Sequence, residues 1–482
     1  MRNAHFPDSP EALEAARRRL AFEELLLYQA ALSLFRRTGR RGVSMAFDDN
    51  ALEAFWAALP FAPTGAQRRV LGEVAADLRS ERAMARMVQG DVGSGKTAIA
   101  FAAMALSHAA GWQSALMAPT EVLARQHYEA AKKLLEPLGL RCGLLVGSLT
   151  PKQHRLAHEA IAAGEWDAVI GTHALITEGV EYPHLGLVVT DEQHRFGVRQ
   201  RTMLSDKGDA PNVLVMSATP IPRTLSLILY GDLDISIVDE LPPGRTPVAT
   251  RIVPEAKREG LYRFLREQVA QGRQAYVVCP LVEESEAVEA LPAEAVYEDL
   301  RTNRLPDLRI ELVHGRMKSA DKDAALKRFR TGEADILVST TVIEVGVNVP
   351  NATVMVIENA ERFGLAQLHQ LRGRVGRGAH ESWCFLMAEP NARLKFLAST
   401  TDGFRIAQKD MELRGPGELF GTRQSGTLTA GIGSLAADAE LLKRTHDEAH
   451  ELLRHPDSPE THQVLALARE RFAEKLEEVG VN

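Results

Sequence analysis

Residues 90 to 97 of this 482-residue chain read Gly90-Asp91-Val92-Gly93-Ser94-Gly95-Lys96-Thr97. A glycine, four variable residues and then Gly-Lys-Ser/Thr form the pattern of a phosphate-binding loop. Its glycines let the backbone turn with positive φ, so that successive N–H groups can converge on phosphate oxygens. Lys96 is placed to reach the β- and γ-phosphates of a nucleotide, and Thr97 to ligate Mg²⁺. The whole loop is therefore predicted to bind a nucleoside triphosphate.

The surroundings of this loop have the alternation expected of a parallel sheet. A short apolar strand, 85–89, precedes the loop, and an apolar helix, 98–110, follows it. The same alternation continues as far as Ile237 with predicted strands at 115–118, 143–146, 168–171, 187–190 and 213–217. Such alternation predicts a sheet covered by helices on both faces, with functional groups at the carboxyl ends of the strands.

Two adjacent acids, Asp191 and Glu192, follow the strand that ends at Thr190. An acid at a strand end beside a phosphate loop can hold Mg²⁺, so Thr97 and Asp191 are the predicted metal ligands. A second acid can orient and deprotonate the attacking water, which is the role expected of Glu192. Adjacent acids are more often a solvated loop, but the apolar strand before them favours a site. Thr190 is expected to form a local hydrogen bond.

Two residues ahead of the loop indicate the base of the nucleotide. Gln67 carries a donor and an acceptor side by side, which complements the N6/N7 edge of adenine. Phe61 can stack on the base. Both lie about one helix upstream of the phosphate loop, so ATP is the expected nucleotide and Mg²⁺ its cofactor.

The second half of the chain repeats the alternation without a phosphate loop of its own. A turn-rich connector, 239–247, marks the boundary. Predicted strands follow at 275–279, 310–313, 336–339 and 353–357. After them the chain reads Gln370-Leu371-Arg372-Gly373-Arg374-Val375-Gly376-Arg377. Closely spaced guanidinium groups suit contact with a transition-state phosphate from outside the loop-bearing domain.

Bulk composition is that of an ordinary globular protein of two or three domains. Apolar residues make up 45% and charged residues 25%, and the net charge of −7 gives no sign of nucleic-acid binding by itself. The three cysteines have no paired spacing, which argues against disulfides and zinc and predicts buried thiols in a reducing compartment. The first twenty residues lack an apolar signal region. A cytoplasmic protein without membrane contact is expected.

The ordered set of motifs resembles the superfamily 2 helicases over 61–378. Further segments are similar to other motifs of that superfamily: 118–126 to motif Ia, 170–173 to Ib, 217–219 to III, 314–315 to IV, and 340–341 with 344–346 to V. The resemblance implies ATP hydrolysis coupled to movement along nucleic acid, with Lys96, Asp191, Glu192 and Gln370 in the catalytic set. It also implies that Arg374 and Arg377 are arginine fingers and that Gly346 contacts the nucleotide.

Within that superfamily the chain resembles the RecG family. The phrases that carry this resemblance are 191–201, 217–224 and 410–426, and the last is similar to the element that RecG shares with the coupling factor Mfd. In those proteins a helical hairpin and loop convert lobe closure into movement along duplex DNA. The opening helix, 6–35, also resembles the RecG segment ahead of the motor. No counterpart of the N-terminal OB-type wedge domain is found.

These observations predict an α/β fold with two tandem RecA-like parallel-sheet lobes. The expected divisions are an N-terminal linker helix at 1–45, an ATP-binding lobe at 46–240, a second lobe at 241–395 and a helical-hairpin extension at 396–482. The opening helix is expected to brace the domain that follows it.

The function expected from this resemblance is ATP-dependent translocation on double-stranded DNA. It would act in replication-fork regression and Holliday-junction branch migration, as a monomer on branched DNA, with single-stranded DNA-binding protein as a further partner. One alternative is an Mfd-like motor that pushes RNA polymerase, although nothing offers a polymerase-binding module. Another is a motor fragment that binds DNA without unwinding it, since the wedge is missing. A small-molecule P-loop kinase is remote, because nothing after Glu240 supports it.

Overall fold

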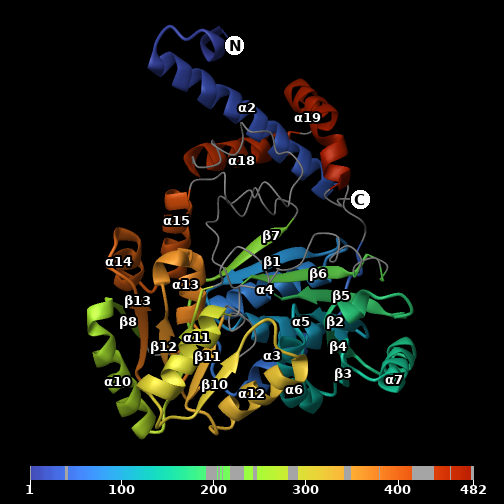
Figure 1. The fold of residues 1–482 in the computed structure, drawn as a ribbon. Coiled ribbons are helices and arrows are strands. Elements are labelled where there is room, and N and C mark those ends of the chain that lie inside the picture. Colours follow the sequence, from blue (N-terminus) through green and yellow to red (C-terminus); the bar gives the residue numbers. More distant parts are fainter. Residues whose placement is uncertain are drawn as a thin grey trace.

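The computed structural model describes residues 2–37, 42–191, 204, 207–208, 210–217, 233–242, 247–280, 291–340, 349–378, 380–414, 439–455 and 458–478. Within this part of the chain, two sheets lie side by side, each covered by helices (Figure 1). Helices from both ends of the chain lie together above them. The predicted two-lobe α/β fold is confirmed.

The first sheet has seven strands in the order β3-β4-β2-β5-β6-β1-β7, and every paired strand runs parallel to its neighbour. Their bounds are β1 Ala85–Gly90, β2 Gln113–Met117, β3 Cys142–Leu145, β4 Ala168–Gly171, β5 Leu185–Thr190, β6 Asn212–Ser217 and β7 Asp234–Val238. All strands predicted here are present. The sequence pattern did not reveal β7, which lies at the edge of the sheet beside β1.

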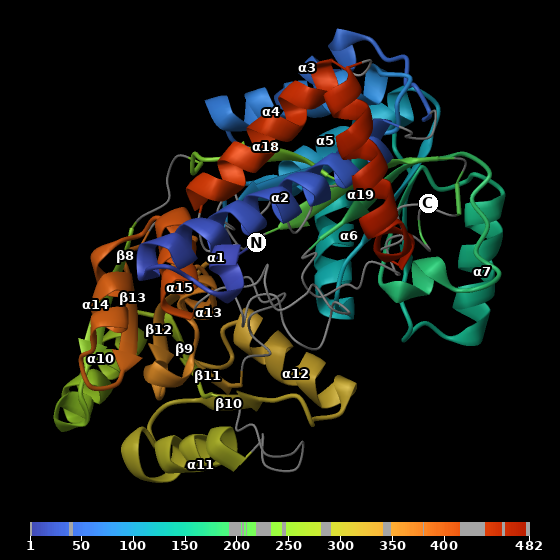
Figure 2. The same cartoon turned by 90° about the horizontal axis from the view of Figure 1, so that it is seen from above.

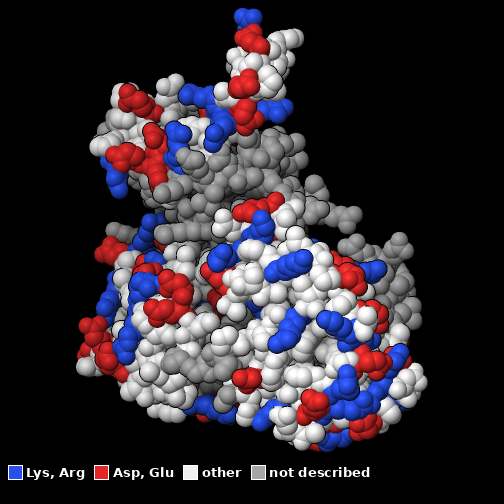
Figure 3. Space-filling view, turned by 90° about the vertical axis from the view of Figure 1, so that its left-hand side faces the viewer, with Lys and Arg blue, Asp and Glu red and all other residues white. Residues whose placement is uncertain are grey.

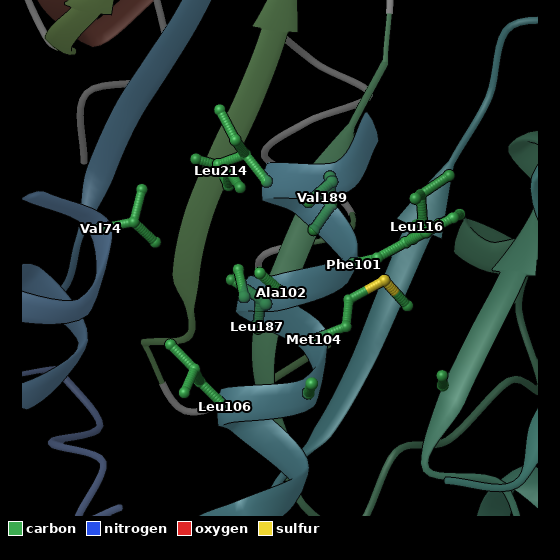
Figure 4. Packing of buried hydrophobic residues seen from close by; sticks show 14 of the residues in the cluster. Val74, Phe101, Ala102, Met104, Leu106, Leu116, Leu187, Val189 and Leu214 are labelled. Carbon is green, nitrogen blue, oxygen red and sulfur yellow. The ribbon is translucent and has the colours of Figure 1, made fainter. Parts of the chain in front are cut away.

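Among the described residues of the first lobe there are five α-helices: α3 Asp49–Ala58, α4 Gly65–Arg79, α5 Lys96–Ala109, α6 Glu121–Leu135 and α7 Pro151–Ala162. Helix α5 follows the phosphate loop and is buried along nearly its whole length, because its sequence is apolar on every side. Figure 4 shows side chains of α4, α5 and the neighbouring strands packed together: Val74, Phe101, Ala102, Met104, Leu106, Leu116, Leu187, Val189 and Leu214. Burial of one such large apolar side chain contributes about 1.5–3 kcal/mol. This core holds the loop at the helix start in place.

The second sheet has six parallel strands in the order β10-β11-β9-β12-β13-β8. Their bounds are β8 Val248–Val253, β9 Gln274–Val278, β10 Ile310–Val313, β11 Ile336–Ser339, β12 Ala352–Ile357 and β13 Ser382–Met387. The accompanying helices are α10 Arg258–Ala270, α11 Leu291–Asp299, α12 Ser319–Arg330, α13 Leu365–Arg372 and α14 Ala392–Ser399. The four predicted strands are present, whereas β8 and β13 were not predicted.

The two ends of the chain pack against each other. The N-terminal elements are α1 Arg2–His5 and α2 Pro10–Arg37, and the C-terminal ones are α15 Gly403–Arg414, α18 Ala439–Arg454 and α19 Pro459–Glu478. Seen from above, α2 runs between α18 and α19 (Figure 2). The rings of Tyr28 and Phe472 meet edge to face with centroids 5.6 Å apart, beside a small apolar cluster. Thus α2 braces the far end of the chain, whereas its expected bracing of the domain that follows stays a prediction.

The surface charges, the cysteines and the helix lengths relate to the expectations drawn from composition. The face in Figure 3 carries basic and acidic side chains interspersed among the residues that are described. All three cysteines are free and buried, as predicted. None of the described helices is both long enough and apolar enough to cross a bilayer.

Candidate active site

The phosphate loop joins β1 to the start of α5. Lys96 is buried, and its Nζ donates to the carbonyl oxygens of Gly90 and Asp91 at 2.7 and 2.8 Å. The ammonium group therefore lies over the loop, where phosphate oxygens would compete for the same donor. Thr97 is half-buried in the first turn of α5.

The glycines allow the loop to turn tightly. Their surroundings show whether a polyphosphate fits the loop. Gly95 directly precedes α5 with φ of 87°, in the left-handed region, and a Cβ there would collide with the Gln67 amide. A Cβ on Gly90 would lie 2.6 Å from Ser94 Oγ. Since Gly95 has no side chain with which to cap the helix, the N-terminal end of α5 can receive an anion. The loop fits a nucleoside triphosphate.

Gln67 lies against the phosphate loop. Its Nε2 donates to the Ser94 carbonyl at 2.8 Å, while its Oε1 accepts from the Thr64 amide at 3.0 Å as part of a capping box for α4. Contact with adenine would use the remaining capacity of this amide, and that role stays a prediction. Phe61, also predicted to contact the base, lies just before α4 with 39% of its surface exposed.

Strand order brings Asp191 to the same edge of the sheet as the loop. β5 ends at Thr190 and is separated from β1 by β6 alone, so Asp191, Ser217 and the loop lie at the carboxyl ends of three adjacent strands. Asp191 Oδ2 lies 2.8 Å from Nε2 of His127, a buried residue of α6. Hydroxyl and carboxylate oxygens such as those of Thr97 and Asp191 are the ligands that Mg²⁺ prefers. His127 was not predicted, and it orients the carboxylate.

The second lobe touches the phosphate loop directly. Nε2 of His369, in α13, lies 2.6 Å from Asp91 Oδ1. One helical turn later, a Cβ on Gly373 would lie 2.8 Å from Cβ of Val92. Val122 of α6 also packs against the apolar cluster beneath α13. The arginine-bearing segment and the phosphate loop, which the sequence predicted would face each other, are therefore adjacent.

The predicted catalytic residues of the second lobe lie on and just after α13. Gln370 and Arg374 are buried, and Arg377 is half-buried with its Nε donating to the Gly373 carbonyl at 3.1 Å. The Tyr276 hydroxyl on β9 lies in the same region, and burial raises its pKa while Arg377 and Arg374 oppose that rise. The placement agrees with phosphate contact by Arg374 and Arg377, although their roles stay predictions.

Arg372 has a different environment from its two neighbours. It is buried, and its Nη1 donates to the carbonyl oxygens of Leu397 and Thr400 at 2.9 and 2.8 Å. Its Nη2 lies 2.8 Å from Nδ1 of His369. These hydrogen bonds tie α13 to the segment around α14, which agrees with the assignment of the finger role to Arg374 and Arg377 and not to Arg372.

Some predicted residues fall outside the part of the chain that the structure describes. These are Glu192, Gly346 and the segments 195–201, 218–224, 341, 344–345 and 415–426. Thr190 was expected to bond locally, but its hydroxyl is buried without a hydrogen-bond partner among the described residues. The described residues also include no cluster of three or more metal-ligating His, Cys, Asp or Glu side chains. A Mg²⁺ ion held largely by phosphate needs no such cluster.

Comparison with protein families agrees with this arrangement. A DEAD/DEAH box helicase model matches residues 64–228, and a helicase conserved C-terminal domain model matches residues 256–379. A third model, for the C-terminal part of domain 3 of the ATP-dependent DNA helicase RecG, matches residues 400–473. The chain is 49% identical over 464 residues to the RecG helicase of Acidithiobacillus ferridurans, covering 95% of this chain and 67% of that protein. The chain belongs to the RecG family.

Other RecG proteins give the same picture over a limited length. Identity to the RecG of Synechocystis is 47%, covering 98% of this chain but 58% of that protein. Identity to the RecG of Escherichia coli K12 is 49%, covering 91% of this chain and 65% of that protein. The chain thus spans roughly three fifths to two thirds of the length of these relatives.

Solved structures support the family and the fold. A RecG structure bound to a three-way DNA junction matches with a TM-score of 0.77 and 43% identity, covering 93% of this chain and 59% of that one. A structure of Mss116p bound to ssRNA and AMP-PNP matches with a TM-score of 0.54 and 17% identity, covering 89% of this chain and 94% of that one, which supports the two-lobe fold alone.

Proposed function

We propose that this chain is the motor portion of an ATP-dependent double-stranded DNA translocase of RecG type. In its full-length form it would regress stalled replication forks and migrate Holliday junctions. The observation that carries this proposal is the contact between α13 and the phosphate loop, with His369 Nε2 2.6 Å from Asp91 Oδ1. A nucleotide bound by the loop would then lie next to the arginines of the second lobe.

The residues have separable tasks in this proposal. Lys96, Thr97 and Asp191 would hold the triphosphate and Mg²⁺, whose charge offsets the charge that develops on the phosphates. Glu192 would accept the proton of the attacking water. Arg374 and Arg377 would approach the phosphates only when the lobes are closed, so hydrolysis is coupled to lobe closure.

Movement on DNA would follow from this coupling. The segments similar to motifs Ia, Ib, IV and V belong to both lobes, so each cycle would change the distance between two sets of DNA contacts. Contacts mainly to phosphate would be insensitive to sequence and weakened by salt. Branched DNA is the proposed substrate, because a relative with 43% identity is bound to a three-way junction. We further propose a monomer that works in the cytoplasm, with single-stranded DNA-binding protein as a partner.

DNA-stimulated ATP hydrolysis tests the site. Lys96→Ala and Arg377→Ala should each lower kcat at least a hundredfold, in the range of about 10²–10³ for loss of one transition-state charge contact. Lys133→Ala and Arg301→Ala replace exposed residues of the same types and should leave the rate unchanged. Parent-like hydrolysis by Lys96→Ala would refute the assignment of the loop.

Junction unwinding separates this function from its alternative. A chain that hydrolyses ATP on duplex DNA and also unwinds a synthetic three-way junction is a helicase by itself. A chain that hydrolyses ATP and binds the junction without unwinding it is a motor fragment. This alternative is favoured by the fact that the chain covers only 58% of the length of one of its relatives.

A further inference from the structure

His369 and Gly373 lie four residues apart on one face of the α13 segment, and both contact the phosphate loop. His369 meets Asp91, while Gly373 packs on the next residue, Val92. The His369 and Asp91 side chains are only 7% and 20% exposed, so water competes weakly for their hydrogen bond. Two consecutive loop residues are thus docked to two turns of one helical segment.

The direction of this hydrogen bond follows from Arg372. A guanidinium group can only donate, and Arg372 Nη2 lies 2.8 Å from His369 Nδ1, so Nδ1 is the acceptor. The ring proton is therefore on Nε2, which donates to Asp91 Oδ1. Arg372 is itself held by two backbone carbonyls near α14. Groups of its own lobe therefore orient the imidazole toward the loop.

Asp91 links the two lobes to the nucleotide-binding lysine. Its carbonyl oxygen accepts from Lys96 Nζ at 2.8 Å, while its carboxylate accepts from the second lobe. On the other side of the contact, Gln370 follows His369 directly, and the carbonyl of Gly373 holds Arg377. The hydrogen bond therefore joins the segment that carries the arginines to the residue beneath Lys96.

We infer that His369 is a positioning residue for ATP hydrolysis. Its Nε2–H to Asp91 hydrogen bond docks the second lobe on the phosphate loop and sets the position of Arg374 and Arg377. His369 acts through Asp91 and does not contact the nucleotide. This inference rests on the proposed ATPase function and adds to it a docking contact between the second lobe and a residue of the phosphate loop.

A pair of conservative variants separates the docking hydrogen bond from the bulk of the side chain. In His369→Gln the terminal amide reaches the position of Nε2 and can still donate to Asp91. In His369→Asn the amide reaches only the position of Nδ1. Loss of one hydrogen bond to a charged acceptor corresponds to roughly a tenfold to hundredfold change in an equilibrium. His369→Asn should therefore lower kcat at least about tenfold with KM for ATP within about twofold, while His369→Gln retains most of kcat.

A direct measure of docking complements the kinetics. Dyes at Glu159→Cys in α7 and Glu267→Cys in α10, both exposed, report the distance between the lobes by energy transfer while the native cysteines are buried. With ATP and a linear DNA duplex, the His369→Asn protein should show less of the closed state than the parent, and His369→Gln should resemble the parent. Unchanged thermal unfolding of both variants would confirm that they fold.

The outcomes are distinguishable from failure of the function itself. Equal kcat and equal energy transfer for the Asn and Gln variants would overturn the inference. So would a double-variant cycle in which His369→Asn and Asp91→Ala have fully additive effects on kcat. If the parent chain shows no DNA-stimulated hydrolysis, the proposed function fails, and the energy-transfer comparison alone decides whether His369 docks the lobes.

Discussion

Replacing Gly373 with alanine adds one methyl group where the second lobe meets the phosphate loop. Gly373 has φ of −68° and ψ of −5°, in the right-handed helical region, so alanine fits its backbone without strain. The added Cβ would lie 2.8 Å from Cβ of Val92 and 2.9 Å from its Cγ1, closer than carbon atoms normally approach. The substitution therefore acts on the contact between the lobes and leaves the folding of the second lobe intact.

The size of the effect follows from the overlap. Overpacking by one methyl group costs about 1–3 kcal/mol where neighbours cannot move. If the lobes meet in this way during hydrolysis, closure becomes less favourable by that amount, and each ~1.4 kcal/mol is a factor of ten. The expected fall in kcat is thus roughly fivefold to a hundredfold. The free energy of unfolding should be unchanged or raised by ~0.4–1 kcal/mol, because alanine restricts the unfolded chain.

DNA-stimulated ATPase rates and thermal unfolding measure the two effects separately. Gly260→Ala is the matched control, since Gly260 lies in helix α10 of the same lobe and a methyl group added there would meet no atom of another element within 4 Å. This control should hydrolyse ATP at the parent rate and unfold at an equal or higher temperature. Parent-like hydrolysis by Gly373→Ala would show that the lobes do not contact each other here in the hydrolysing state.

Two further predictions concern the thiols and the chain ends. Burial raises the pKa of each cysteine to about 12, so the thiols should stay protonated and unreactive toward a disulfide reagent at pH 8 and react only after unfolding: Cys142, Cys279 and Cys384. In the unfolded chain the thiols have their ordinary pKa of about 8.5, so their burial as neutral groups contributes fully to stability below that pH. The contribution is lost as pH rises toward about 12, because the unfolded chain then ionises more readily than the folded one. Denaturant titrations should therefore give a lower free energy of unfolding at pH 10 than at pH 7.5. Phe472→Ala removes the ring that packs on Tyr28, which should weaken that contact by ~3–5 kcal/mol. Hydrogen exchange should then increase in α2 and α19, while β1 stays protected. As a control, replacement of the exposed Leu467 by alanine should leave hydrogen exchange in α2 and α19 unchanged. Equal exchange in the Phe472→Ala and Leu467→Ala proteins would contradict docking of α19 on α2.

Two of the strands that the sequence missed, β7 and β8, are less buried than most of those it predicted. β5 is buried at every residue, and its run of apolar side chains identifies it directly. β7 and β8 are edge strands, and several of their side chains are partly or fully exposed. An edge strand has one unpaired side and more contact with water, so its sequence need not be continuously apolar. Exposure explains why β7 and β8 were missed, but position in the sheet is not the whole reason: the edge strands β3 and β10 were predicted, whereas β13, an inner and largely buried strand, was not.

The candidate site was predictable where one short segment carries the chemistry. The phosphate loop and the acid after β5 are determined by local turns and strand ends, so residue spacing was enough to find Lys96 and Asp191. His127 and His369 are different, because each acts through a partner that is 64 or 278 residues away in the chain. Only the packing of α6 on its sheet, or of one lobe on the other, brings these groups together.

The three arginines of residues 370–377 show why spacing alone could not assign their roles. Arg372 ends α13 and points to carbonyl groups of its own lobe, whereas Arg374 and Arg377 follow Gly373, where the helix has ended. The side chain of Arg372, at the last helical position, faces the body of its own lobe. Arg374 and Arg377 lie beyond the end of the helix and so do not share that direction. The glycine is also the residue that admits Val92 of the other lobe. The absence of a side chain at this one position thus permits the contact that would bring the arginines to the phosphates.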